Sequence, residues 1–366
     1  MSCGAAVSRL EAVLRPEIRA LSAYHVPPAA GLLKLDAMEN PYRWPGELED
    51  AWLASLRGAE LNRYPLPHPA DLVQALARQA GVPPGCELLL GNGSDELIQL
   101  IDLCVARPGA CVLLPTPTFS MYSLIARVAG LDVREVPLRA DFGLDLPAML
   151  AAIAQHRPAL IYLACPNNPT AGLFDVDAVR AVIAAAPGLV VVDEAYFPFA
   201  GRSVLPWLLE FEHLLVLRTL SKVGLAGLRL GYLIGHGQWL REFDKARLPY
   251  NINTLTQLSA QFALAHADRL AGEAARIRAD RAQLLAGLGA LPGVTAYPSD
   301  TNFILLRLPA GRAPGAHEAL RRAGILVKNV HGSHPLLADC LRVTVGTAAE
   351  NDALLAALAA HLTGTT

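Results

Sequence analysis

The sequence contains little charge and few aromatic residues, and neither sign of charge dominates. Charged residues make up 17% and aromatic residues 6% of the 366 residues, and the formal net charge is −2 at pH 7. Without an excess of basic residues, a surface for nucleic acid or anionic membrane is not expected. Hydrophobic residues make up 53% of the chain, which excludes a disordered protein, and the length predicts about two domains.

The sequence also lacks paired cysteines, a long apolar run and a signal peptide. No CxxC pair occurs, so we expect reduced, mostly buried thiols and a cytoplasmic location. No apolar run reaches the roughly 18 residues of a membrane-spanning helix, and no apolar core of a signal peptide follows the first residues. The six cysteines are scattered over the chain at Cys3, Cys86, Cys104, Cys111, Cys165 and Cys340.

Four short apolar runs alternate with helical patterns, and each run ends in a polar turn. Their near-continuous apolar character is typical of parallel strands that are covered on both faces. We therefore expect an α/β fold with a mostly parallel sheet flanked by helices. The runs cover residues 111–117, 159–169, 188–197 and 214–222.

The pattern changes near residue 251, which predicts a second, smaller α+β domain. One long Ala-rich amphipathic helix is expected up to Pro292. Short strands within 301–308, 324–330 and 341–347 then alternate with helices near 314–323 and 348–362. We predict an N-terminal arm over residues 1–44 that packs on the small domain, a large domain over 45–250 and the small domain over 251–366.

Reactive side chains in an open α/β sheet gather just beyond the carboxyl ends of its strands. Lys222 follows one such run among apolar neighbours, where desolvation would lower its pKa and make it an amine nucleophile toward an aldehyde. Asp193 ends another run, and a buried carboxylate requires a cationic partner such as a pyridinium nitrogen. Tyr196 follows it and could donate to a phenolic oxygen on the same ring. Taken singly, these residues could also be a solvated lysine, a capping or salt-bridged aspartate and a core tyrosine.

The segment GNGSDEL at residues 91–97 places two glycines and Ser94 before a helical pattern, which is typical of an anion site. It is neither a dinucleotide fingerprint, since Glu96 stands where the third glycine belongs, nor a P-loop. A simple helix N-cap at Ser94 or Asp95 is the alternative. Thr219, Ser221 and Arg229 could hold the same phosphate. A Schiff-base lysine, a pyridinium-pairing aspartate, a phenol and a phosphate cradle are together what pyridoxal phosphate requires.

Several motifs resemble those of class I and II aminotransferases, which are fold-type I pyridoxal-phosphate-dependent transferases. These motifs are TLSKVGLAGLRLGY, VVVDEAYF, CPNNPT and LRVTVGT. The segments KLDAMENPYRWP, RYPLP, GNGSDELIQL and LPTPTFSMY are similar to the histidinol-phosphate aminotransferase subfamily. The resemblance implies transfer of an amino group between L-histidinol phosphate and 2-oxoglutarate in L-histidine biosynthesis. An aromatic aminotransferase, a threonine-phosphate decarboxylase and a non-catalytic regulator are the alternatives.

The resemblance also implies roles for individual residues. Lys222 would bind the cofactor covalently and move the proton, while Asp193 would keep the ring nitrogen protonated. Tyr196 and Asn168 would bond the 3-oxygen of the ring, and Phe119 would stack on it. The remaining implied contacts are Gly93, Ser94, Asp95, Thr219, Ser221, Arg229 and the neighbouring subunit's Tyr64 at the phosphate, and Tyr24, Asn40, Lys328 and Arg342 at the substrate. Because Tyr64 would come from a second subunit, the resemblance implies a homodimer with shared active sites.

The sequence differs from the family pattern at three places, and it contains one pair of nearby histidines. An additional Ala171 in the NNPT turn is expected to shift that turn. Arg229 follows Lys222 by seven residues where many relatives have eight, and Lys328 stands where several relatives have arginine, which removes the bidentate fork but keeps the charge. We interpret His331 and His334 as surface-loop histidines rather than metal ligands, with His331 near the substrate region, and predict no metal.

Overall fold

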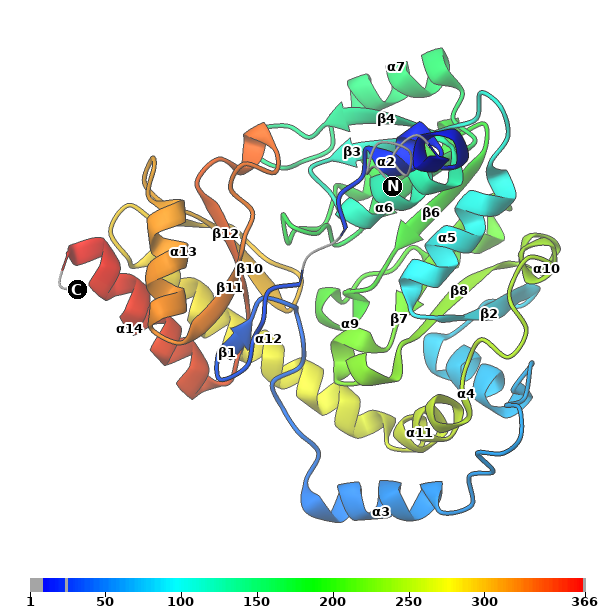
Figure 1. The fold of residues 1–366 in the computed structure, drawn as a ribbon, viewed down its shortest axis with the longest axis horizontal. Coiled ribbons are helices and arrows are strands. Elements are labelled where there is room, and N and C mark those ends of the chain that lie inside the picture. The colour runs from blue at the N-terminus through cyan, green and yellow to red at the C-terminus, as the bar shows by residue number, and fades with distance from the viewer. Residues whose placement is uncertain (1–8, 24–25, 365–366) are drawn as a thin grey trace.

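The computed structural model describes residues 9–23 and 26–364, and two sheets organise them (Figure 1). The large sheet has seven strands in the order β2-β8-β7-β6-β5-β3-β4. Only β8 runs antiparallel to its neighbours, β2 and β7. The mostly parallel sheet expected from the sequence is therefore confirmed. Its strands are β2 (Cys86–Asn92), β3 (Cys111–Thr116), β4 (Asp132–Pro137), β5 (Leu160–Ala164), β6 (Leu189–Asp193), β7 (Leu214–Thr219) and β8 (Leu230–His236).

Helices cover both faces of the large sheet. Alternate residues of a strand point to opposite faces, and both faces are apolar here. Ile161 and Leu163 of β5 join one apolar core, whereas Leu160 and Tyr162 join the other. The first core contains residues of α4 (Ala70–Ala80), α7 (Leu146–His156) and α8 (Val176–Ala185). The second contains residues of α5 (Ser94–Val105), α6 (Ser120–Ala129) and α10 (Gly237–Asp244).

A second, five-stranded sheet has the order β1-β11-β12-β10-β9. Its strands are β1 (Leu33–Leu35), β9 (Thr295–Ala296), β10 (Phe303–Arg307), β11 (Ile325–Asn329) and β12 (Cys340–Thr344). Helices α12 (Ala267–Gly289), α13 (Ala313–Arg322) and α14 (Ala348–Thr363) share its apolar core. Strands β10–β12 and helices α13 and α14 agree with the expected elements.

The single long helix expected after residue 251 is wrong, because the structure has two helices there. Helix α11 (Thr254–Ala265) begins at Asn253, whose side chain accepts a hydrogen bond from the Thr256 amide at 2.9 Å. The break is at His266, whose backbone is not helical (φ −115°) and whose ring is 2.9 Å from the Phe262 carbonyl oxygen. Helix α11 packs on α3 (Gly46–Leu56) and α4, whereas α12 continues to the small sheet (Figure 1).

The N-terminal arm contacts both halves of the molecule. Strand β1 pairs in parallel with β11 of the small sheet, but the short helix α2 (Pro16–Arg19) contacts α6 of the large half. The domain boundaries at residues 44 and 250 stay predictions. No helix in the described part of the chain is long and apolar enough to cross a membrane.

Candidate active site

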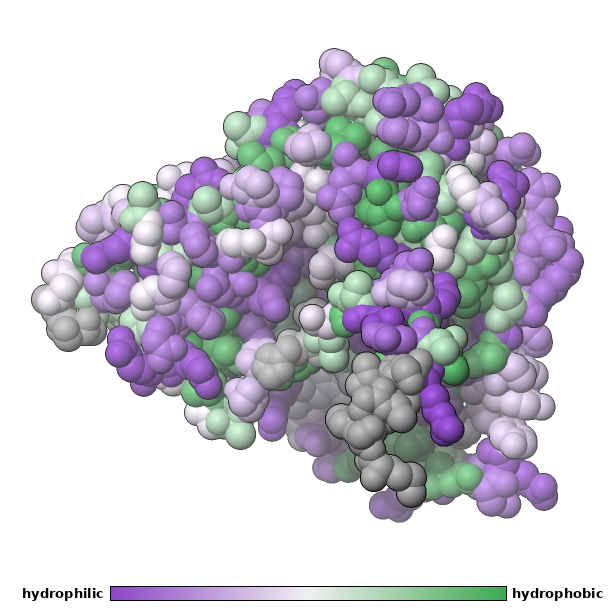
Figure 2. All heavy atoms as spheres, turned by 45° about the horizontal axis from the view of Figure 1, so that its top comes forward, coloured by the Kyte–Doolittle hydropathy of each residue, from purple (hydrophilic) through white to green (hydrophobic). Residues whose placement is uncertain are grey.

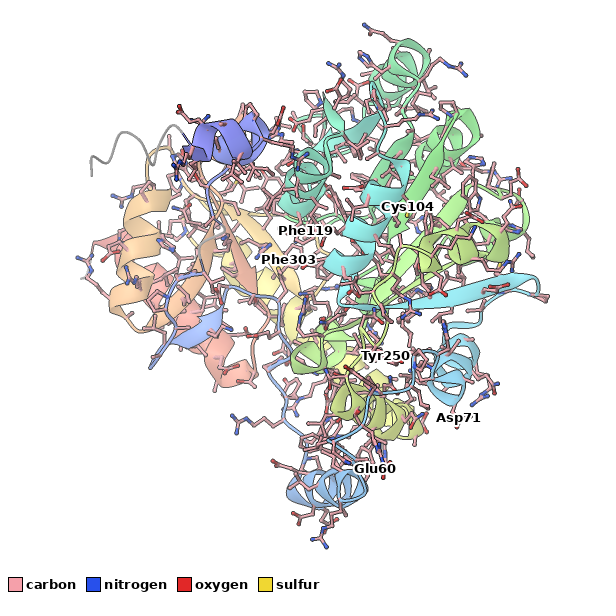
Figure 3. All side chains as sticks on the ribbon, turned by 45° about the vertical axis from the view of Figure 1, so that its right-hand side comes forward. Glu60, Asp71, Cys104, Phe119, Tyr250 and Phe303 are labelled. Atoms are coloured by element: carbon pink, nitrogen blue, oxygen red, sulfur yellow. The ribbon has the colours of Figure 1, made fainter. Side chains whose placement is uncertain are left out.

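A cavity of about 400 Å³ lies at the carboxyl ends of β6 and β7, on the side that faces the small sheet. The surface is hollowed between the two lobes, and hydrophilic side chains gather along this hollow (Figure 2). Phe119 of the large half and Phe303 of β10 lie at the boundary between the lobes (Figure 3). Ten of the residues singled out from the sequence line this cavity: Ser94, Asp95, Phe119, Asn168, Asp193, Tyr196, Thr219, Ser221, Lys222 and Arg229.

Lys222 lies in η2 (Ser221–Val223), one short turn after β7. The Thr219 hydroxyl oxygen accepts from the Ser221 amide at 3.1 Å, which fixes the start of this turn. Burial and, after it, the positive charge of Arg342 lower the pKa of Lys222 to about 8, against the opposing effect of Asp95. The neutral, nucleophilic amine is therefore accessible near neutral pH.

Asp193 is the last residue of β6 and is buried. One carboxylate oxygen accepts from the Tyr122 hydroxyl at 2.7 Å and the other accepts from the Ala195 amide at 2.9 Å. Burial raises the pKa of Asp193 to about 6, although both hydrogen bonds oppose the shift. A cation that entered the cavity beside this carboxylate would be stabilised by it.

Tyr196, Asn168 and Arg342 form a hydrogen-bonded chain that joins the large half to the small sheet. The Asn168 amide donates to the Tyr196 hydroxyl at 3.3 Å, and Arg342 of β12 donates to the Asn168 side-chain oxygen at 2.6 Å. Arg342 also donates to the Asp36 carbonyl at 2.7 Å. A group bound at the Tyr196 hydroxyl is therefore one residue away from a buried guanidinium.

The turn between β2 and α5 forms an anion cradle. Helix α5 begins after Gly93, and no side chain caps its amides, so the simple N-cap interpretation of Ser94 and Asp95 is wrong. Gly93 has φ +85°, and a Cβ there would lie 2.6 Å from the Arg229 guanidinium. Gly231 of β8 likewise leaves room for the Ser94 amide, which a Cβ would meet at 2.6 Å. The two glycines thus bring uncapped amides and a guanidinium together, which suits a phosphate.

A second cavity of about 300 Å³ adjoins the first, and Met38, Phe119 and Asn168 line both. Lys328 of β11 and Arg342 of β12 line it from the small sheet, where they are opposite one another in the antiparallel register. An anion bound in this cavity could therefore be contacted by two cationic side chains at once.

A model of the family described as "Aminotransferase class I and II" matches residues 30–358. The chain belongs to this family. A "Histidinol-phosphate aminotransferase 2" of Nitrosococcus oceani is 54% identical over 95% of this chain and 96% of its own. A "Histidinol-phosphate aminotransferase 1" of Ralstonia nicotianae is also 54% identical, over 96% of this chain and 95% of its own. The crystal structure of the Sinorhizobium meliloti histidinol-phosphate aminotransferase with pyridoxal-5′-phosphate superposes with a TM-score of 0.85 at 28% identity, over 97% of this chain and 98% of its own.

The aminotransferase fold predicted from the motifs is confirmed, but two of the predicted site residues, Tyr64 and Asn40, line neither cavity of their own chain. Tyr64 is 81% exposed and stacks on Tyr250 with ring centroids 4.6 Å apart, and it lines neither cavity. Asn40 donates to Glu273 at 2.7 Å and lies behind the Lys222 turn, beside Gly224, rather than on either cavity. Tyr24 lies outside the described residues.

Two residues that the sequence analysis did not single out belong to this aminotransferase site. Tyr122 donates to Asp193, and it lies one helical turn after Phe119 within the motif TFSMY, which could have identified it. Met38 has φ +55°, a conformation that costs a non-glycine residue energy. Its amide donates to the Thr344 hydroxyl at 3.0 Å, and its carbonyl accepts from Asn302 at 2.9 Å. No sequence signal indicates this strain.

The departures from the aminotransferase pattern have structural explanations. Ala171 itself has φ +68°, whereas Gly172 has no positive φ. Ala171 thus occupies the conformation that glycine adopts readily, and Asn168 lines the cavity with this turn in place. Arg229 reaches the cradle despite its shorter spacing because its own backbone is left-handed (φ +50°).

The two histidines of the HGSH segment differ in their surroundings. His334 lines the second cavity, so the expectation that His331 is the one near the substrate region is wrong. His331 is exposed and its ring accepts from the Asp339 amide at 2.8 Å. Among the described residues, no group of three or more His, Cys, Asp and Glu side chains is placed to hold a metal ion.

Proposed function

We propose that this aminotransferase transfers an amino group between L-histidinol phosphate and 2-oxoglutarate, yielding imidazole-acetol phosphate and L-glutamate, as a step of L-histidine biosynthesis. The observation that carries this proposal is the pair Lys328 and Arg342, which lines a cavity directly beside Lys222 and Asp193. A phosphate monoester and a distal carboxylate are both anions that such a pair can bind. The names of the full-length relatives give independent support.

The cofactor of the proposed reaction is pyridoxal 5′-phosphate, and the first cavity fits it. The uncapped amides after Gly93, with Arg229, suit its phosphate, while buried Asp193 suits its ring nitrogen. Tyr196 and Asn168, which are hydrogen-bonded to one another and linked to Arg342, would hold the 3-oxygen of the ring. When bound, the cofactor supplies an aldehyde and an electron-withdrawing ring.

The side chains of this protein then bind, orient and move protons. Lys222 Nζ, with a pKa of about 8, would hold the cofactor through its aldehyde. The same Nζ would take the proton from the donor carbon that bears the amino group and give it back to the cofactor, as general base and general acid. Asp193 would pair with a protonated ring nitrogen, and Phe119 would lie against the ring.

A coupled assay with histidinol phosphate and 2-oxoglutarate tests this function. We expect glutamate to form in proportion to histidinol phosphate consumed, with phenylalanine and tyrosine much poorer donors. A preference for the aromatic donors would instead support an aromatic aminotransferase, and release of carbon dioxide from threonine phosphate would support the decarboxylase. A purified protein without the yellow absorption of a bound cofactor would favour the non-catalytic regulator.

Substitution of Arg342 is expected to weaken the binding of both amino donors. A lost charge-assisted hydrogen bond corresponds to a roughly 10- to 100-fold rise in KM, for histidinol phosphate and glutamate alike. Arg342→Lys, which keeps the charge without the fork, should lie between wild type and Arg342→Gln. Steady-state kinetics with each donor measure this effect. Unchanged KM values for both donors in Arg342→Gln would rule out the shared anion site.

We infer that the protein acts as a homodimer in which Tyr64 reaches the cofactor phosphate of the neighbouring subunit. Two observations support this proposal. The Tyr64 side chain is exposed, and so are three apolar side chains at or near its position, each at least 65% exposed: Leu61, Leu66 and Leu248. Exposed apolar groups of this size are typical of an interface between subunits. A cytoplasmic location belongs to the same proposal and is supported by the five free cysteines among the described residues.

Mixed dimers test the shared site. Tyr64→Ala and Lys222→Ala should each be nearly inactive when the cofactor is limiting. A mixed dimer contains one site built from the intact Lys222 of one chain and the intact Tyr64 of the other. Refolding the two variants together should therefore recover about a quarter of wild-type activity. Activity no greater than the sum of the separate variants would contradict the shared site.

A further inference from the structure

At the wall of the cofactor cavity, four buried side chains form a continuous array, and the proposed chemistry so far uses only one of them, Asp193. The Tyr122 hydroxyl donates to Asp193 at 2.7 Å, and the Tyr162 hydroxyl donates to Asp102 at 2.8 Å. The two tyrosine rings stack with centroids 4.6 Å apart and parallel planes. Both tyrosines and Asp102 are completely buried.

This surrounding fixes the position of the Tyr122 hydroxyl. Tyr122 packs edge-on against Phe119 at 5.4 Å on one side and stacks on Tyr162 on the other. Tyr162 lies in the middle of β5, and its hydroxyl is within 3.3 Å of the Ile98 carbonyl as well as bonded to Asp102. A ring held by one stacked and one edge contact loses little further freedom when its hydroxyl makes a hydrogen bond.

We propose that Tyr122 is a positioning residue: its buried hydroxyl holds the Asp193 carboxylate ionised and oriented toward the ring nitrogen of the cofactor. The ring of Tyr162 supports Tyr122 in this position. The inference rests on the proposed binding of pyridoxal phosphate, and it assigns to Tyr122 a part of that binding energy. Tyr122 lines the cavity beside Asp193 but acts through the carboxylate.

The electrostatic surroundings of Asp193 make this hydrogen bond important. The pKa of Asp193 is raised to about 6, because burial and Asp95 raise it by more than Tyr122, the Ala195 amide and Lys222 lower it. Without the Tyr122 bond the pKa would rise further, and a neutral carboxyl group would remain up to higher pH. The ionisable groups that face Asp193 from other elements are Asp95 of α5, Tyr122 of α6, Tyr162 of β5, Tyr196 and Lys222.

The test uses pyridoxamine 5′-phosphate as the probe, because its amine forms no covalent bond with Lys222. Its affinity for the apoenzyme is measured by fluorescence titration between pH 5 and 9. Wild-type affinity should fall as the pH decreases through about 6, where Asp193 becomes protonated. In Tyr122→Phe the midpoint should move upward by about one to two pH units, the equivalent of a lost hydrogen bond to a charged group. Affinity at pH 7 then falls roughly 2- to 10-fold, while affinity at pH 9 stays nearly the same.

Two further proteins separate this role from a structural one. Tyr162→Phe removes a buried phenolic hydroxyl from the adjacent ring but leaves the ring and the Asp193 bond in place, so its midpoint should equal that of wild type. Site-specific 3-fluorotyrosine at position 122 is a stronger donor of nearly the same size, so its midpoint should move downward. This second substitution also serves if Tyr122→Phe does not fold.

The outcomes distinguish this inference from the proposed function. If wild-type apoenzyme does not bind pyridoxamine phosphate, the proposed cofactor is wrong. If wild type binds the probe and Tyr122→Phe keeps the wild-type midpoint, Tyr122 does not control Asp193. An equal upward shift in Tyr122→Phe and Tyr162→Phe would assign the effect to loosened packing and would also overturn the inference, as would an upward or absent shift with 3-fluorotyrosine.

Discussion

Lys222→Ala is expected to lower kcat for histidinol phosphate by roughly 10⁴-fold or more, because one amine provides both the nucleophile and the proton-transfer group. Its environment supports both roles, since burial and Arg342 lower the pKa of Lys222 to about 8. Single-turnover kinetics with the cofactor-loaded enzyme measure the loss. A small primary amine such as methylamine should restore part of the rate to Lys222→Ala, since the space left by the side chain can admit a soluble base.

The controls for this prediction come from the few lysines of the chain, which has four. Lys245 forms an exposed ion pair with Glu242, so Lys245→Ala should keep the wild-type rate. Lys222→Arg keeps a cation that stays protonated and should be as inactive as Lys222→Ala. Borohydride reduction of the holoenzyme and peptide mapping should place the reduced cofactor at residue 222. A label on Lys34, Lys245 or Lys328, or no label, would overturn the proposed mechanism.

Asp193→Asn is expected to lower kcat by roughly 10²- to 10³-fold, the effect typical of removing one preorganised electrostatic group. Asparagine has nearly the same shape, its single oxygen can still accept from the Ala195 amide, and its NH2 group can donate to the Tyr122 hydroxyl, so the fold should be preserved. What it removes is the negative charge that keeps the cofactor ring protonated. The measurement is the single-turnover rate with histidinol phosphate at saturating cofactor, with circular dichroism to compare the folds.

The pH dependence separates loss of charge from a structural effect. Wild-type affinity for pyridoxamine phosphate should fall as Asp193 is protonated below about pH 6. Asp193→Asn has no such group, so this acidic limb should disappear, while Asp193→Glu should retain it. A variant rate within about threefold of wild type would mean that the carboxylate is not the partner of the ring nitrogen.

The sequence predicted the cavity residues well because the fold class dictates where strand ends meet. Lys222, Asp193 and Asn168 are far apart in the chain, yet each follows a parallel strand, and such ends face one edge of the sheet. Once the four apolar runs are interpreted as parallel strands, the convergence of these three residues follows. The Gly93 turn was predicted for a related reason, since a glycine before a helix start leaves amides open to an anion.

Three features were not predicted from the sequence: the helix break at His266, the partner of Asn40 and the partner of Tyr122. The break at His266 involves neither glycine nor proline, so periodicity alone predicts one helix. Asn40 lies in a motif that resembles the subfamily, but its side-chain amide donates to Glu273 of α12, which is 233 residues away in the chain. The link between Tyr122 and Asp193 requires knowing that α6 lies over β6. Neither the helix break nor either hydrogen bond produces a periodic or compositional signal in the sequence.

The position of Met38 has a mechanical consequence. This residue lines both cavities, and both its amide and its carbonyl are bound to side chains of the small half, Thr344 and Asn302. Its sulfur, in contrast, lies 3.7 Å from the hydroxyl of Tyr196 in the large half. A rotation of one lobe against the other would therefore change the contact between the Met38 sulfur and the Tyr196 hydroxyl. Such a change would be felt in both cavities, because the same methionine forms part of the wall of each.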